Sequence, residues 1–146
     1  MRELDDTTNR SLMCLGVYLA TDVEQSLIPF DETRPGFNAG ALTEYESAVA
    51  DYLKSRYVYR LGSHTHCGCG FMRNGDSEPQ DVDASRSAMG RFVAAARSRG
   101  PCRLFVYWTG DPLGEPVAVI SRRPADLVND EEWIVEGTLT NVLSGD

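Results

Sequence analysis

The chain lacks any long hydrophobic run. Its longest uninterrupted apolar stretch, residues 12–20, is nine residues long, whereas a membrane-spanning helix needs about 20. The N-terminus carries Glu3, Asp5 and Asp6, so it is acidic where a secretory signal is basic and then apolar. These absences predict a soluble cytoplasmic protein that makes no membrane contact.

Basic residues are also scarce. The chain has 14 Lys and Arg against 22 Asp and Glu, which gives a net charge of −8. This balance argues against a general nucleic-acid binder, because such proteins neutralise phosphates with a basic face. The charge is −6 over residues 1–50, +4 over 51–105 and −6 over 106–146. The acidic flanks suit a basic protein partner, and a homo-oligomer is also compatible with the sequence.

Several motifs that carry known chemistry are missing. The sequence contains no Walker A loop, no Gly-x-Ser-x-Gly elbow and no His-Glu-x-x-His pair. Gly68 and Gly70 lack the third glycine that dinucleotide-binding loops require. We therefore expect none of the activities that depend on these motifs.

What is present is a globular composition. The chain has 146 residues, of which 42% are hydrophobic and 25% charged. This length lies near the commonest size of a single domain. We expect one domain that spans residues 1–146 and has one hydrophobic core.

The apolar spacing predicts an α/β (or α+β) fold with the order β-α-β-α-β-β-(α)-β. We expect a mixed, mostly parallel sheet of 4–5 strands with helices packed on it and a C-terminal hairpin. The predicted strands are residues 12–20, 56–61, 102–108 and 117–120, with a last strand at 133–135, with or without residues 138–143. The predicted helices begin at Thr43 and at Asp81 or Asp83, the second ends at Gly100-Pro101, and a helical turn opens at Pro124.

The strand directions decide which loops meet. Right-handed crossovers would make the first three strands parallel, so their carboxyl ends would share one edge of the sheet. The segments that leave that edge are residues 21–22, 62–70 and 109–111. We expect a functional site among them.

The middle segment concentrates residues that bind metals. Within residues 62–70 lie both histidines of the chain, His64 and His66, and two of its four cysteines, Cys67 and Cys69. Imidazole and thiolate are ligands that zinc prefers, and the glycines let the backbone fold back on itself. The cluster predicts a metal site formed by these four residues. Its cofactor is zinc or another soft or borderline transition metal.

The spacing differs from that of zinc fingers, which use two Cys-x(2–4)-Cys pairs. In an extended backbone the two histidines face one way and the two cysteines the other, so convergence requires a turn. A ligand from a neighbouring strand end or from a second subunit could complete a tetrahedron. The candidates in this chain are Cys14, Asp22 and Asp111.

The remaining cysteines have a simpler interpretation. Four cysteines in a chain without an export signal are expected to stay reduced. Cys14 and Cys102 lie inside apolar runs, where cysteine usually packs as a small hydrophobic residue. We expect both to belong mainly to the core.

Thiol chemistry is the first alternative to a metal site. The Cys67-Gly-Cys69 pair can close a strained, redox-active disulfide. Either cysteine could instead act as a nucleophile with His64 or His66 as its base. Cys67, Cys69 and His64 are therefore the candidate catalytic residues, and whether the protein is an enzyme stays open.

A second alternative needs no chemistry at the loop. Residues 62–70 would then form a glycine-dependent structural turn. The protein would be an acidic, non-enzymatic interaction protein.

Overall fold

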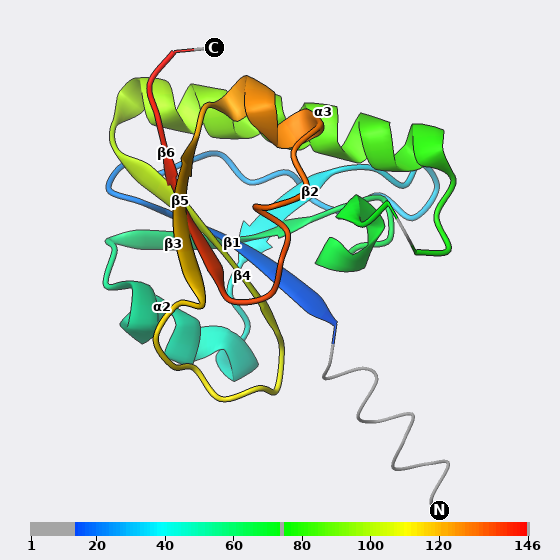
Figure 1. Ribbon diagram of the computed structural model, residues 1–146. Coiled ribbons are helices and arrows are strands. Elements are labelled where there is room, and N and C mark those ends of the chain that lie inside the picture. Colours follow the sequence, from blue (N-terminus) through cyan, green and yellow to red (C-terminus); the bar gives the residue numbers. More distant parts are fainter. Residues whose placement is uncertain (1–13, 74, 146) are drawn as a thin grey trace, which may run out of the picture.

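The structure, a computed structural model, describes residues 14–73 and 75–145. In this part of the chain, six strands form one open sheet of a mixed α+β fold (Figure 1). The strands are β1 (Leu15–Thr21), β2 (Asn38–Ala41), β3 (Tyr57–Gly62), β4 (Cys102–Trp108), β5 (Ala118–Arg122) and β6 (Thr138–Val142). The helices are α2 (Ser47–Leu53) and α3 (Pro79–Arg99), and the short helical turns are η1 (Glu44–Glu46), η2 (Gly68–Phe71) and η3 (Pro124–Val128).

The strand order across the sheet is β2-β3-β1-β4-β6-β5. Every neighbouring pair is antiparallel except β5 and β6. The predicted sheet of 4–5 mostly parallel strands is therefore wrong. All seven residues of β1 are buried, which is typical of a central strand covered on both faces. Burial on both faces does not set the direction of the neighbouring strands.

Three further predictions about strands fail. No strand forms at residues 133–135, which are turns and a bend, and the last strand, β6, begins at Thr138. No strand is predicted between residues 20 and 43, yet this segment contains β2, which pairs with β3. The predicted C-terminal hairpin is also wrong, because β5 pairs with β6 and β6 lies between β4 and β5. A turn sequence after β4 indicates only that the chain reverses. Here the next strand, β5, pairs with β6, which comes later in the chain.

Other elements agree with the sequence pattern. Strand β4 has the predicted bounds, and α3 ends at Arg99, directly before Gly100 as expected, although it begins at Pro79 rather than at Asp81 or Asp83. The predicted turn at Pro124 is η3. The first predicted strand is β1 from Leu15 onward, and its residues 12–13 lie outside the described residues.

Helices cover both faces of the sheet, with α3 on one side and α2 on the other (Figure 1). Alternate residues of β1 divide between these two layers. Leu15, Val17 and Leu19 belong to the core beneath α3, while Tyr18 and Ala20 pack with residues of α2. Among the described residues, no helix is long and apolar enough to cross a membrane.

The antiparallel pairing decides which loops meet. Strands β3 and β4 both run opposite to β1, so their carboxyl ends lie beside the beginning of β1. The segment after β3 therefore meets Cys14, and Thr109 donates its backbone N–H to the Cys14 carbonyl at 3.0 Å. Asp22, at the other end of β1, is excluded from this edge.

Candidate metal centre

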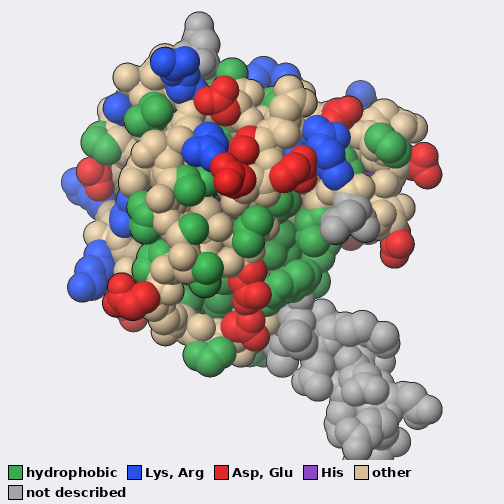
Figure 2. All heavy atoms as spheres, viewed as in Figure 1, with side chains coloured by type: hydrophobic (Ala, Val, Ile, Leu, Met, Phe, Trp, Pro, Cys, Tyr) green, Lys and Arg blue, Asp and Glu red, His purple; other side chains and the backbone are tan. Residues whose placement is uncertain are grey.

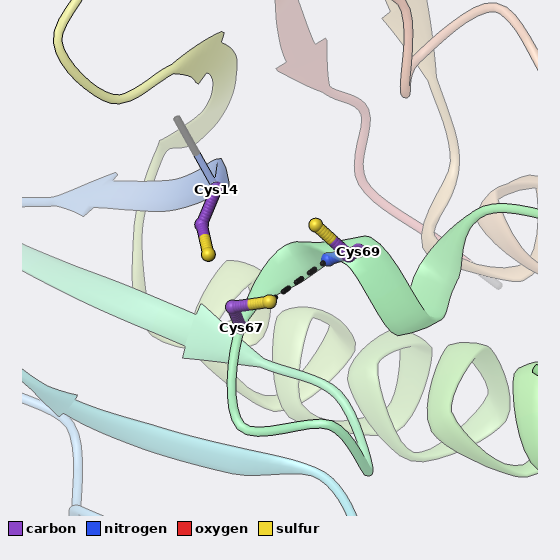
Figure 3. Close-up of side chains that lie close together, drawn as sticks. All are labelled: Cys14, Cys67 and Cys69. Carbon is purple, nitrogen blue, oxygen red and sulfur yellow. Dashed lines mark hydrogen bonds between the residues drawn. The ribbon is translucent and has the colours of Figure 1, made fainter. Parts of the chain in front are cut away.

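Three cysteines converge at this edge of the sheet. The Sγ atoms of Cys14, Cys67 and Cys69 all lie within 4.8 Å of one another. Figure 3 shows that they come from two parts of the chain: Cys14 precedes β1, whereas Cys67 caps η2 and Cys69 lies within it. All three are half-buried. In the described part of the chain, no other His, Cys, Asp or Glu joins this group.

The loop before η2 is closed by Ser63. Its backbone N–H and its hydroxyl both donate to the Cys67 carbonyl, at 2.9 and 2.6 Å. The Ser63 carbonyl accepts the N–H of His66 at 2.9 Å. This tight turn, in which His66 has a φ of 78°, reverses the chain after β3 and carries Cys67 back toward β1.

Two glycines let η2 approach its neighbours closely. A Cβ at Gly68 would lie 2.5 Å from the Leu15 carbonyl oxygen, and a Cβ at Gly70 would lie 2.2 Å from the Ser63 hydroxyl. Real Cβ atoms do not approach so closely, so only glycine fits at both positions. The Cys-Gly-Cys-Gly sequence thus brings two thiols against the beginning of β1.

Backbone donors are directed at two of the sulfurs. The N–H of Leu15 donates to Cys69 Sγ and the N–H of Cys69 donates to Cys67 Sγ, each at 3.5 Å. The hydroxyl of Thr65 lies 3.6 Å from Cys67 Sγ. Donors that point at a sulfur stabilise the thiolate over the thiol, so the local fold favours the form that binds metals.

The three thiols differ in acidity. A hydrogen bond from the Cys69 thiol, together with the Cys69 backbone N–H, lowers the pKa of Cys67 to about 5. The same hydrogen bond, with burial, raises the pKa of Cys69 above its ordinary value. Burial and the nearby charge of Cys67 raise the pKa of Cys14. Without a metal ion, the group thus holds one thiolate and two thiols at neutral pH.

The two histidines lie outside this group. The ring of His64 is held between two serine hydroxyls, Ser85 at Nδ1 and Ser77 at Nε2, each at 3.0 Å. His66 stacks on Phe30 with ring centroids 4.2 Å apart. The structure thus brings together two of the four predicted ligands, Cys67 and Cys69, and replaces the histidines by Cys14.

The other residues considered from the sequence do not join the group. Asp22 lies at the far end of β1, where it lines a separate hollow with Lys54 and Cys102. Asp111 forms a hydrogen bond with the carboxyl group of Glu136 and raises the pKa of Glu136.

Cys102 is buried in the core, as expected. The expectation that Cys14 belongs mainly to the core is corrected, because the residue is half-buried and its sulfur lies beside the other two.

Turn η2 is anchored from the α3 side by a buried arginine that the sequence analysis did not single out. Arg86 is fully buried, and its Nε donates to the carbonyl of Phe71, the last residue of η2, at 2.8 Å. Both of its Nη atoms bind Glu131, at 2.8 and 3.0 Å. On the face shown in Figure 2, acidic and basic side chains lie next to one another.

A cavity of about 420 Å³ opens beside the cysteines. Cys14 and Cys67 line one part of it, and Glu46 and Arg60 line another. Arg60 pairs with Glu46 at 3.3 Å. Two of the three cysteines, Cys14 and Cys67, therefore border a cavity that could admit a small molecule.

Comparison of the chain with protein-family models, with curated proteins and with solved structures gives no match. The geometry of the site therefore carries the functional interpretation.

Proposed function

We propose that the protein binds a transition-metal ion, with zinc the first choice, through the thiolates of Cys14, Cys67 and Cys69. The observation that carries the proposal is the convergence of three sulfurs from β1 and η2 within 4.8 Å. Zinc–sulfur bonds of about 2.3 Å place the sulfurs of a tetrahedral site about 3.8 Å apart. A contraction of about 1 Å at most would bring this group to that spacing.

The surroundings support a bound cation. Backbone N–H groups already donate to the sulfurs of Cys67 and Cys69, and such donors offset the negative charge that three thiolates place around one divalent ion. The donor set is soft, which favours Zn²⁺ or Cu⁺ over Mg²⁺ or Ca²⁺. Zinc sites with three protein ligands leave a position for water or substrate, so we assign an open site.

The test is elemental analysis of protein purified without a histidine tag and without added chelator. We expect about one zinc per chain. Substitution by Co²⁺ then provides a spectroscopic check, because thiolate ligands give an intense charge-transfer band in the near ultraviolet. Protein that carries no metal and shows no such band with Co²⁺ would overturn the proposal.

Metal affinity is expected to fall steeply with falling pH. Between about pH 6 and 8, Cys67 is already a thiolate, whereas the raised pKa values of Cys14 and Cys69 keep these groups protonated. Binding then releases two protons, so each pH unit downward weakens the apparent affinity by about 100-fold. Titration in buffers of different ionisation enthalpy measures the protons released. A pH-independent affinity would contradict ligation by three thiolates.

A thiol-redox protein is the second candidate function, favoured by the pKa of about 5 at Cys67. Its reaction would convert two thiols and one hydrogen peroxide into one disulfide and two waters. Metal-free protein that loses two hydrogen masses on peroxide treatment would support it. Both functions need reduced thiols, so we retain a cytoplasmic location within the proposal.

A further inference from the structure

The cavity beside the cysteines runs along the beginning of β1, where Gly16 lines it. A Cβ at Gly16 would lie 2.6 Å from the ring and hydroxyl of Tyr18. Tyr18 therefore folds over Gly16, and its hydroxyl donates to Glu46 at 2.8 Å. The Tyr18 ring fills the space that a side chain at position 16 would need, and Gly16 lines the cavity together with Cys14 and Cys67. Two of the three cysteines therefore line this cavity.

The cavity also presents a positively charged group. The Glu46 carboxylate is 7% exposed and accepts hydrogen bonds from Tyr18, from the backbone and hydroxyl of Thr43, and from Nη1 of Arg60. This saturated carboxylate fixes the guanidinium in place. In the described part of the chain, Nε and Nη2 of Arg60 have no hydrogen-bond partner. Arg60 therefore has donors left for a second carboxylate, which its planar fork fits well.

We propose that the cavity binds a small molecule that carries both a thiol and a carboxylate, with the sulfur completing the metal site and the carboxylate pairing with Arg60. The proposal rests on the metal function above. A soft three-sulfur site favours a soft fourth donor, and on binding the ligand thiol releases its proton to solvent. Apolar groups make up most of the cavity lining, which suits the methylene groups between the two ends.

The experiment uses the Co²⁺ form of the full chain and three probes: 3-mercaptopropionate, 2-mercaptoethanol and propionate. We expect 3-mercaptopropionate to change the charge-transfer band and to bind roughly tenfold more tightly than 2-mercaptoethanol, because it gains a charge-assisted hydrogen bond. Propionate is expected to leave the band unchanged. Metal content measured after desalting shows whether a thiol has removed the ion instead.

Arg60→Gln separates the role of the arginine from that of the metal. Without a probe, this variant is expected to keep the cobalt spectrum of the natural protein, while its preference for 3-mercaptopropionate falls to about one. Arg60→Lys retains the charge without the planar fork and is expected to keep part of the preference. It also provides a folded comparison if Arg60→Gln is unstable.

The outcomes distinguish this inference from the metal proposal. Protein without a thiolate–cobalt band overturns both. A normal band that no thiol alters overturns the ligand inference alone. Equal affinity for the two thiols would overturn the proposed role of the ligand carboxylate. An unchanged preference for 3-mercaptopropionate in both Arg60 variants would do the same.

Discussion

Replacement of Cys14 by serine is expected to weaken zinc binding by more than about 100-fold. Loss of a residue that only supports a metal ligand already costs about 10–100-fold, and Cys14 supplies one of the three sulfurs directly. A hydroxyl is not ionised at neutral pH, so Cys14→Ser cannot restore the ligand. Competition with a chromophoric chelator measures the affinity. The thermal midpoint gives a second readout, because zinc should raise it in the natural protein and not in the variant.

Two matched variants test whether the effect is specific. Cys102→Ala also removes one cysteine, but from the core at the opposite end of the sheet, where Cys102 pairs with Thr21 of β1. His66→Asn removes a ligand that the sequence predicts, and asparagine tolerates the positive φ at this position. Both variants should bind zinc normally. If His66→Asn loses the metal while Cys14→Ser retains it, the ligand set is the one expected from the sequence.

The positions of most strands can be predicted from the sequence, whereas the directions of the strands cannot. Strand β4 and the burial of Met89, Val93 and Ala96 on α3 follow from apolar spacing. The antiparallel pairing of β3 with β1 depends on contacts between residues far apart in the sequence. The same holds for β2, which is added at the edge of the sheet beside β3. Local periodicity carries no information about such contacts.

The ligands of the candidate metal site are also only partly predictable from the sequence, because they too depend on long-range contacts. The concentration of Cys67 and Cys69 in a glycine-rich segment was visible in the sequence. The two histidines share that segment, yet the turn around Ser63 directs His64 toward α3 rather than toward the sulfurs. The position of Cys14 follows from strand direction alone: parallel pairing would have brought Asp22 to the loop, whereas antiparallel pairing brings Cys14.

Replacement of Arg86 by methionine is expected to destabilise the fold by about 3–5 kcal/mol, because a buried carbonyl left without its donor costs about 1–3 kcal/mol and Arg86 donates to three of them. The Arg86 side chain is fully buried. It donates to the carbonyls of Phe71, Val128 and Asp130 as well as to Glu131, and its guanidinium lies 5.7 Å from the Trp133 ring centroid. Methionine fills the volume but leaves the three carbonyls without this donor. Urea denaturation of the metal-free protein measures the loss.

Arg91→Met is the matched control, because Arg91 is an exposed arginine on the same helix. Substitutions at exposed positions usually change stability by less than about 0.5 kcal/mol. The Glu131 side chain is 53% exposed. A loss of stability of only about 0.5 kcal/mol for Arg86→Met would therefore mean that the Arg86–Glu131 pair and its neighbours contribute no more than a surface ion pair. A large loss of stability in Arg86→Met alone would instead show that Arg86 holds α3 and η2 together. The position of Cys67 and Cys69 beside Cys14 would then depend on a residue that touches none of the three sulfurs.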